Sequence, residues 1–475
     1  MLNHNDYLFL DTSVVNAQQT RNAQLRIRPA EKSPTAPLLW EEYSADPPRS
    51  WEARFDNGYP HVFWDPSIDR YRLYYTVFII DESSTSVSHE SRPSSVYIPG
   101  SDRTAALCYA ESRDGIMWEK PELGIVEFEG NAANNIVMRN AHGTSVVRDE
   151  RDPNPERRYK LITKLEFSST HHFMVVAFSD DGIHFSEPRP WPRYNPRADT
   201  HNFAYWDAQR NEFGLITRLW SNGLRVAAKS ESSDFVSWSE PREVFRGQGF
   251  AEQVYSMPVV PYAQGYLGFP AMFHEGDRSS ADFDTVDTRL AFSTDGEHWE
   301  LVCPDQAIVG RGAGHYPDGD FDSSCIYSAA PISIGDEIAL YYMGSNGPHT
   351  GYREAALGRA TFEKDKFAYY EAVDSDAESL LVTTPFSLSG NTVELLVELD
   401  SEGFVEVELR KGLEQIAGFG REEFMSITEV DGWAILQFDA QKLESLGGEA
   451  VSFWIHGRHA RVFAIRGALE SIPRP

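Results

Sequence analysis

The segment Ser179-Asp180-Asp181-Gly182-Ile183-His184-Phe185 closes the strand-like run HHFMVVAFS, and three similar segments occur elsewhere in the chain. Each of the four has a serine, an aspartate two positions later and an aromatic residue at its end. Asp and Ser side chains cap turns, and the Gly present in three of the copies accepts a positive φ angle. Each copy therefore predicts a tight turn between two strands. The other three are Ser112–Trp118, Ser232–Trp238 and Ser293–Trp299.

A second type of hairpin precedes each turn, and a fifth such hairpin follows the last one. In each hairpin two runs of alternating or apolar residues, rich in aromatic and β-branched side chains, are joined by Asp, Asn, Pro or Gly. The pattern predicts five units of four antiparallel strands, and such units repeated around an axis form a β-propeller. We therefore predict an all-β fold, a five-bladed β-propeller. The five hairpins are 61–76, 144–163, 202–218, 256–273 and 326–344.

The four serine–aspartate turns are interpreted as structural. Their side chains suffice to cap a hairpin, with the aromatic residue packed beneath. They resemble the Asp box of sialidases, a structural turn that lies away from the active site. They identify blades and do not indicate chemistry.

The pattern changes after Val373. A polar linker, DSDAESL, leads into about a hundred residues with six or so strands and no further blade-type turns. This region, 380–475, is predicted to be a β-sandwich accessory domain appended to the propeller. The propeller itself is predicted over 51–373, with 1–50 as an N-terminal segment that closes it.

Composition limits the functional classes. The 475 residues carry a net charge of −29, which argues against nucleic acid or an anionic membrane as partner. No apolar run is long enough to span a bilayer, and the N-terminus lacks the features of a signal peptide. Three cysteines distant in sequence suit a reducing, cytoplasmic location. No cofactor or metal ligand set is indicated, and the oligomeric state stays open.

The first strand of each propeller unit should line the central channel, so the starts of these strands meet at one face. Four of the five starts contain carboxylates and the second contains a histidine. Carboxylates gathered in a partly dry cavity raise one another's pKa values, which is costly unless a ligand or reaction uses them. We therefore expect the site at this face. The five starts are 55–59, 141–144, 199–202, 250–255 and 316–323.

The chain resembles the five-bladed propeller glycosidases, namely glycoside hydrolase family 32 and the related arabinanase and arabinofuranosidase families. It is most similar to bacterial family 32-like proteins in the segments 108–137, 156–163, 199–207 and 341–351, within a resemblance that covers Trp51 to Gly467. The resemblance implies an Asp nucleophile in the first blade, where Asp56 lies. The family's Glu-Cys acid is missing, and Arg151-Asp152-Pro153 falls in a turn on the wrong side of its blade.

The predicted function is a glycoside hydrolase, exo-acting on a small furanoside or fructoside-type carbohydrate. Two carboxylates that flank a glycosidic bond serve as acid and as base or nucleophile. From position, Asp56 is the predicted nucleophile or base, Asp199 the stabilising carboxylate and Glu252 the proton donor. Asp320 or Asp322 is the main rival for these roles. Predicted substrate-binding residues are Asn57, His142, His201, Asn202, Gln253, Tyr255, His274, Glu275, Asp318, Asp320, Asp322 and His349.

Two alternatives remain. A phosphorylase or transglycosidase would need basic residues near the mouth of the channel, and no Arg/Lys cluster is evident in the sequence. A non-catalytic carbohydrate-binding propeller could use Asp318, Asp320 and Asp322 to hold a structural cation, since hard cations prefer carboxylate oxygens. The enzyme hypothesis requires that Asp56, Asp199 and Glu252 share one pocket of sugar size.

Overall fold

The computed structural model describes residues 6–168, 170–335, 337–428, 432–438 and 442–472. Strands dominate, and within these ranges the only α-helix is the single turn α1, Glu82–Thr85. The prediction of an all-β chain is confirmed. No helix in the described ranges has both the length and the apolar character needed to cross a membrane.

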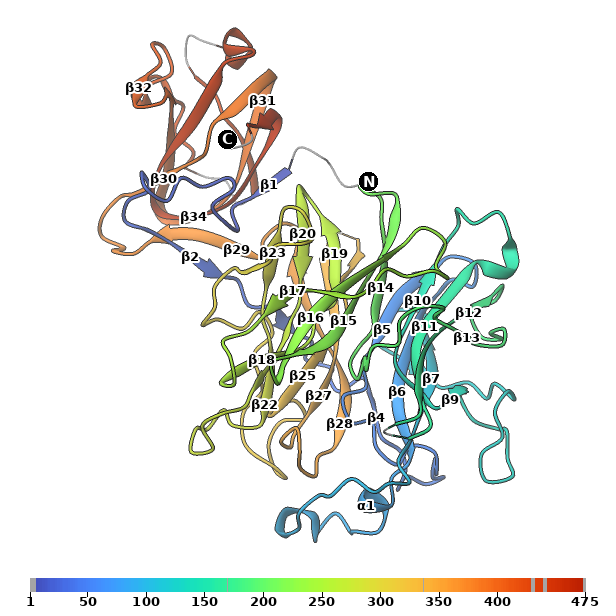
Figure 1. Cartoon of the computed structure of the whole chain (residues 1–475). Helices are drawn as coiled ribbons and strands as arrows, with labels where there is room; N and C mark the ends of the chain where they lie inside the picture. Colours follow the sequence, from blue (N-terminus) through green and yellow to red (C-terminus); the bar gives the residue numbers. More distant parts are fainter. Residues whose placement is uncertain (1–5, 169, 336, 429–431, 439–441, 473–475) are drawn as a thin grey trace.

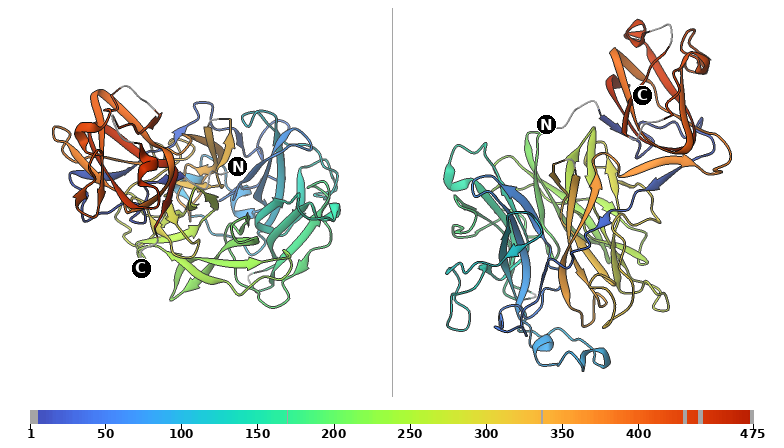
Figure 2. Two further views of the ribbon diagram at one scale, coloured as in Figure 1. Left: turned by 90° about the horizontal axis from the view of Figure 1, so that it is seen from above. Right: turned by 180° about the vertical axis from the view of Figure 1, so that it is seen from behind.

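Four sheets are arranged as blades around a common axis, as in a propeller (Figures 1 and 2). In each the strands follow chain order from the inside outwards, and the inner strand β10 contacts both β5 and β14. The short strand β9 (Ile136–Arg139) pairs additionally with β7. The four blades are β5 (His61–Asp65), β6 (Arg70–Ile80), β7 (Thr104–Ser112) and β8 (Trp118–Glu119); β10 (Ala141–Arg148), β11 (Tyr159–Glu166), β12 (His172–Ser179) and β13 (Arg189–Pro190); β14 (Phe203–Asp207), β15 (Glu212–Ser221), β16 (Leu224–Ser232) and β17 (Arg242–Arg246); and β19 (Val259–Tyr262), β20 (Gly265–Gly268), β23 (Ala291–Ser293) and β24 (Glu300–Leu301).

A nine-stranded sheet accompanies these blades, and its strand β18 contacts β15, β16 and β17 of the third blade. Its strands β3 and β4 come from the N-terminal segment and pair with β28. The N-terminus thus supplies outer strands to a sheet built mainly from the second half of the chain. The nine are β18 (Glu252–Ser256), β21 (Ala271–His274), β22 (Thr285–Thr288), β25 (Cys325–Ser328), β26 (Ile332–Ile334), β27 (Glu337–Ser345), β28 (Ala355–Glu363), β3 (Glu31–Lys32) and β4 (Leu39–Trp40).

An eight-stranded sheet lies beside the blades, coloured orange to red in Figure 1 except for its blue strands β1 and β2, and Leu396 and Phe463 in it share a core with Leu267 and Phe292 of the fourth blade. Two N-terminal strands belong to it, because β1 pairs with β34 and β2 with β29. Its own core includes Phe9, Val397 and Phe453. The eight are β1 (Asp6–Leu8), β2 (Ala23–Ile27), β29 (Ala368–Ala372), β30 (Ser379–Val382), β31 (Phe386–Lys411), β32 (Glu414–Gln415), β33 (Gly432–Ile435) and β34 (Ala450–Ser471).

The four serine–aspartate turns join the two outer strands of each blade, and their polar groups are used locally. In the second turn the Asp181 carboxylate accepts hydrogen bonds from the backbone N–H groups of Ile183 and His184, both at 2.8 Å. Ser179 Oγ accepts one from the N–H of Gly182. The other three turns repeat these bonds. Their predicted structural role is confirmed.

We expect Asp181→Ala to lower the free energy of unfolding by about 1–2 kcal/mol, as for the loss of a capping side chain, and to leave enzymatic activity unchanged. Urea unfolding and a turnover assay measure the two effects. The exposed neighbour Asp180, changed to Ala, is the matched control and should shift stability by less than about 0.5 kcal/mol. Loss of activity in a folded Asp181→Ala protein would contradict the structural assignment.

Two histidines are buried side by side, His61 at the start of β5 and His201 two residues before β14. His61 Nε2 lies 2.9 Å from the carbonyl oxygen of Val146, and the His61 ring packs against those of Phe203 and His201. Burial lowers the pKa of His61 to about 4, and burial together with the nearby His61 lowers that of His201 to about 3. Both are therefore neutral in the folded protein near pH 7.

These shifts predict a pH-dependent stability. Below about pH 6.5 the unfolded chain binds a proton at each histidine while the folded chain does not, so stability falls as pH drops towards about 4. The slope is at most about 1.4 kcal/mol per pH unit for each histidine. Urea unfolding between pH 7.5 and 5.5 should show a shallower dependence for His61→Gln. The exposed His184, changed to Gln, should leave the slope as it is in the wild type.

Candidate active site

A cavity of about 730 Å³ lies at the end of the blades where the inner strands begin. Segments before β5 and β14 and the start of β10 contribute to its wall, together with residues 96–103, between β6 and β7, residues 166–168 and residues 349–350. The volume falls in the range of small-molecule sites. The site is thus at the predicted face of the propeller. Six predicted site residues line it: Asp56, Asn57, His142, Asp199, Tyr255 and His349.

Asp56 is surrounded by arginines from three parts of the chain. Its Oδ1 atom lies 2.9 Å from Arg54 Nε and 2.6 Å from Arg353 Nη2, and its Oδ2 atom 3.9 Å from Arg103 Nη2. Burial raises the pKa of Asp56, but the charges of Arg353, Arg54 and Arg103 outweigh it and hold the pKa well below its usual value. The carboxylate is therefore ionised and strongly stabilised in that form, which makes it a weak base.

Asn57 and Tyr255 form the floor beside Asp56. Asn57 Nδ2 donates hydrogen bonds to the hydroxyl oxygens of Tyr59, at 2.8 Å, and Tyr255, at 3.3 Å. The Asn57 side-chain oxygen accepts one from Arg353. His349 stacks edge-on against Tyr255, with ring centroids 4.7 Å apart. These contacts fix an aromatic and amide surface of the kind that packs against a sugar.

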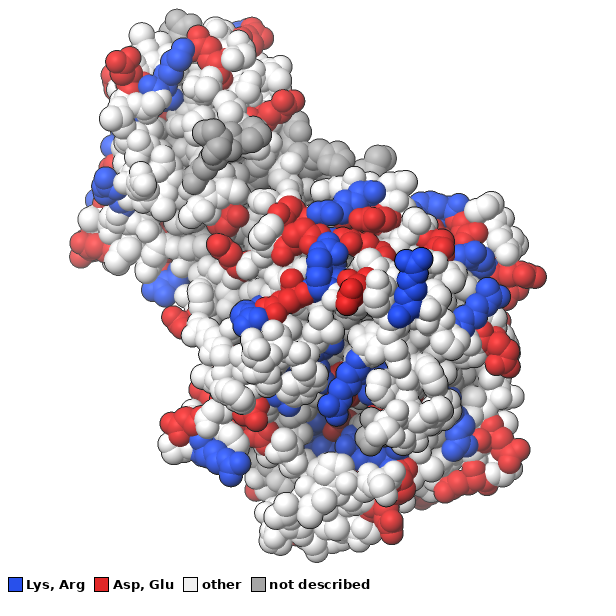
Figure 3. All heavy atoms as spheres, in the orientation of Figure 1, with Lys and Arg blue, Asp and Glu red and all other residues white. Residues whose placement is uncertain are grey.

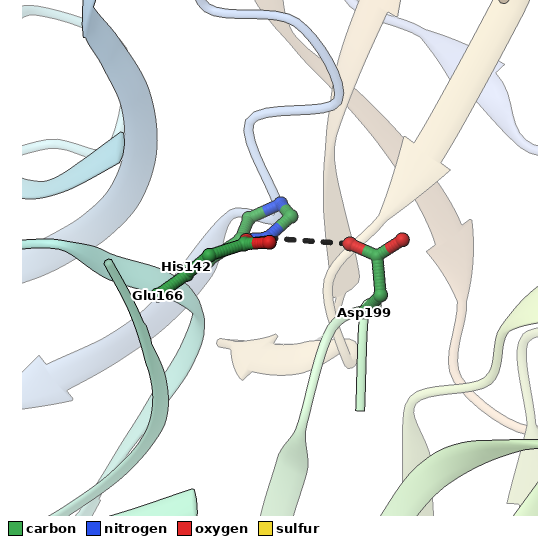
Figure 4. A group of neighbouring side chains, drawn as sticks. All are labelled: His142, Glu166 and Asp199. Carbon is green, nitrogen blue, oxygen red and sulfur yellow. Dashed lines mark ion pairs between the residues drawn. The ribbon is translucent and has the colours of Figure 1, made fainter. Parts of the chain in front are cut away.

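His142, Glu166 and Asp199 converge from β10, the end of β11 and the segment before β14 (Figure 4). His142 Nδ1 lies 3.4 Å from both Glu166 Oε2 and Asp199 Oδ1. His142 is buried, whereas the side chains of Glu166 and Asp199 are about one-third exposed, at 32% and 36%. An imidazole thus lies between two carboxylates that face the cavity.

Cations neutralise both carboxylates. Arg218 Nη2 lies 3.0 Å from Asp199, and Lys164 Nζ lies 3.1 Å from Glu166 and 3.9 Å from Asp199. Burial raises the pKa of each, but for Glu166 the contacts with His142 and Lys164 lower it to about 2. For Asp199 the charges of Arg218, His142 and Lys164 hold the pKa below its usual range. Both are ionised at neutral pH.

The same three side chains are the only group within the described ranges whose ligand atoms lie close enough together to hold a metal ion. One imidazole and two carboxylates suit a divalent transition metal by donor type. However, Lys164 and Arg218 already supply the positive charge that an ion would bring, and an ion would have to compete with them. We therefore infer no role for a metal ion in the chemistry of this site.

Glu252, the predicted proton donor, does not line the cavity. It lies with Arg289 and His274, at 3.4 and 4.0 Å, and burial raises its pKa. The requirement that Asp56, Asp199 and Glu252 share one pocket is thus met by the first two only. Glu166 takes the place of the third carboxylate.

Several predicted binding residues are engaged elsewhere. Asn202 is buried, and its amide bonds to backbone carbonyls and to Thr217. Gln253 and Glu275 bond to each other and to Arg225. His274 pairs with Asp287, and His201 is enclosed by aromatic rings.

The carboxylates predicted for a structural cation do not converge either. Asp322 is buried and bonds to Lys32 Nζ, at 2.6 Å, and to the Tyr342 hydroxyl. Asp318 and Asp320 are exposed, and Asp320 caps the N–H of Ala313. None of the three lines the cavity.

Sequence reasoning missed the basic residues of the site. Arg54, Arg103 and Arg353 surround Asp56, and Lys164 and Arg218 pair with Glu166 and Asp199, although no basic cluster was expected. Figure 3 shows Lys and Arg atoms in a recess in the lower part of the molecule, above the segment that contains α1. Arg54 is two residues from Asp56 in the sequence, and this short separation was the one sequence feature that indicated a basic residue beside Asp56.

The similarity of this chain to known proteins is confined to distant likenesses among solved structures. No protein-family model matches the chain, and no curated protein matches it. Among solved structures, it is similar to an N-acetylgalactosamine deacetylase from F. plautii in complex with blood group B trisaccharide (16% identity, 71% of this chain and 96% of that one, TM-score 0.48). Others are a glycosyl hydrolase from Bacteroides ovatus (13%, 71% and 95%, 0.47) and the α-L-arabinofuranosidase of Podospora anserina with cellotriose (12%, 70% and 98%, 0.45). All three TM-scores lie below 0.5, so none of these likenesses supports a function for this chain.

Proposed function

We propose that the protein is a glycoside hydrolase, exo-acting on a small furanoside or fructoside-type sugar. The observation that carries the proposal is one sugar-sized cavity lined by carboxylates from three separate segments, Asp56, Glu166 and Asp199. Carboxylates beside a scissile glycosidic bond supply base or nucleophile and stabilise the oxocarbenium-like transition state. Phe78, Tyr97 and Tyr255 supply the apolar wall that a sugar face needs.

The roles follow from the contacts. Asp199 is the most exposed of the three carboxylates and is ionised, so it serves as the nucleophile. His142, between Asp199 and Glu166, gives a proton to the leaving oxygen and regains one from the attacking water, and Glu166 orients its ring. Asp56, with three arginines around it, orients these guanidinium groups and is not the nucleophile.

The test is hydrolysis of a panel of p-nitrophenyl furanosides and pyranosides, sucrose and short fructans. Turnover of a furanoside or fructoside, released from a chain end, supports the proposal. Absence of turnover across the panel with folded protein would contradict this substrate class.

We also propose the finer features of the architecture. The β25–β28 part of the nine-stranded sheet, closed by β3 and β4, would be a fifth blade, because β27 and β28 pair as the central strands of the other blades do. The eight-stranded sheet would fold as a β-sandwich around its core. A cytoplasmic location is supported by three buried, unpaired cysteines.

A further inference from the structure

The end of the cavity around Asp56 carries more positive charge than the protein itself neutralises. Three guanidinium groups, those of Arg54, Arg103 and Arg353, share one carboxylate. Arg54 and Arg353 are each only 2% exposed, so water screens them weakly. Like charges held together in such surroundings repel one another, and a buried charge is costly unless it is paired.

Among the other carboxylates nearby, Asp284 interacts with the charge of Arg353 and accepts hydrogen bonds from Thr350. Glu41 feels the charge of Arg54, but burial raises its pKa to about 7, so it is only partly ionised at neutral pH. Its carboxylate accepts the backbone N–H of Phe55. Glu354 is paired with Arg92, at 3.0 Å.

The two arginines that line the cavity have donors to spare. Arg54 uses Nε for Asp56 and Nη2 for the carbonyl oxygen of Gly351, while its buried Nη1 atom has no hydrogen-bond partner among the described residues. The buried Nε of Arg103 likewise has none in the described part of the chain. An unpaired buried donor is costly, so an acceptor that pairs with these groups would be bound favourably.

Aromatic rings fix both guanidinium groups. Arg54 Cζ lies 4.1 Å from the ring centroid of Tyr97, and Arg103 Cζ lies 3.6 Å from that of Phe78. All four residues line the cavity. A stacked guanidinium keeps its edge free, and the N–H groups on that edge match the geometry of a carboxylate or phosphate.

We propose that Arg54 and Arg103 bind an oxyanion in this cavity. Its source is either an acidic group on the sugar, as in a uronic acid or a sugar phosphate, or free inorganic phosphate. An anion needs such a local excess of guanidinium groups to bind, because the protein as a whole carries a net charge of −29 and repels anions. The inference deepens the proposed function by naming the charge of what the site accepts.

The experiment is isothermal titration of the full-length protein with D-galacturonate, D-glucuronate and inorganic phosphate, and with D-galactose and D-glucose as neutral matches. We expect at least one anion to bind ten times or more tightly than the neutral sugars, and its affinity to fall as salt is raised. Arg103→Gln should remove this preference and Arg103→Lys retain part of it. Arg103 makes only a distant ion pair, so these variants spare the Arg54–Asp56–Arg353 contacts.

The controls separate the outcomes. Exposed Arg113, changed to Gln, should bind like the wild type. Binding of the sugar acids assigns the oxyanion to the substrate, and binding of phosphate alone assigns it to free phosphate. Equal affinity for anions and neutral sugars, or a preference that survives Arg103→Gln, overturns the proposal. Because the assay measures binding, an anion site in a protein without turnover on the panel would contradict the proposed substrate class and not the anion site.

Discussion

Asp199→Asn is expected to lower kcat/KM for the glycoside substrate by about a thousandfold, the effect of losing a carboxylate that acts in bond cleavage. The substitution keeps the size of the side chain and removes the charge that Arg218, His142 and Lys164 surround. The measurement is initial rates on the best substrate of the panel. Thermal unfolding of the same samples checks that the protein is folded, since Arg218 loses its partner.

Glu252→Gln is the matched control for Asp199→Asn. Glu252 is also a partly buried carboxylate paired with an arginine, but it does not line the cavity, so its loss should change kcat/KM by less than about threefold. The opposite result, with activity lost in Glu252→Gln and kept in Asp199→Asn, would support Glu252 as the proton donor and contradict the role proposed for Asp199.

A second readout tests the role of Asp199 itself. Asp199→Ala removes the carboxylate and leaves room for a small anion. If Asp199 is the nucleophile, added azide or formate should take its place and restore part of the turnover. No such rescue is expected for Glu166→Ala, because Glu166 acts through His142. Rescue of neither variant, with both proteins folded, would assign Asp199 a positioning role.

Local features were predictable from the sequence. The serine–aspartate turns depend on bonds between residues two or three positions apart, so the pattern Ser-x-Asp carries all the necessary information. The convergence of Asp56, His142 and Asp199 was also predictable, because each lies at or just before the start of an inner strand and the propeller brings these starts together.

The direction of side chains and the register of strand pairing explain why the sequence did not predict that Glu252 lies outside the cavity and that Glu166 lines it. Strand β18 is irregular between Val254 and Ser256, so the alternation of a regular strand does not predict the direction of Tyr255 relative to that of Glu252. Tyr255 lines the cavity and Glu252 contacts Arg289. Glu166 enters the site because β11 returns alongside β10, with Lys164 opposite His142. Arg353 reaches Asp56 from a distant part of the chain, and no local pattern announces such a contact.

Asp65→Ala is expected to lower the free energy of unfolding by about 3–5 kcal/mol, the cost of breaking a buried ion pair by removing one partner. Asp65 is fully buried at the end of β5, and its Oδ2 atom accepts hydrogen bonds from Arg72 Nε and from the Tyr159 hydroxyl of the next blade, both at 2.6 Å. Ser67 donates to Oδ1. Arg72, itself 2% exposed, is left without its carboxylate.

The pH dependence follows from the same contacts. Burial raises the pKa of Asp65, but bonds from Ser67 and Tyr159 and the charge of Arg72 bring it below its usual value. The stabilisation is therefore present above about pH 4 and is lost as pH falls further. Urea unfolding at pH 7 measures the main effect, and exposed Glu119 on β8, changed to Ala, should shift it by less than about 0.5 kcal/mol.

The double variant Asp65→Ala/Arg72→Met separates the pair from its parts. If most of the cost comes from the unpaired charge of Arg72, removing that charge should recover a large share of the stability lost in Asp65→Ala. If the double variant is as unstable as the sum of the two single variants, the stability comes from the bonds of Asp65 to Ser67 and to Tyr159 of the next blade, and not from the ion pair. A loss below about 1 kcal/mol in Asp65→Ala would show that neither the ion pair nor the hydrogen bonds of Asp65 stabilise the fold substantially.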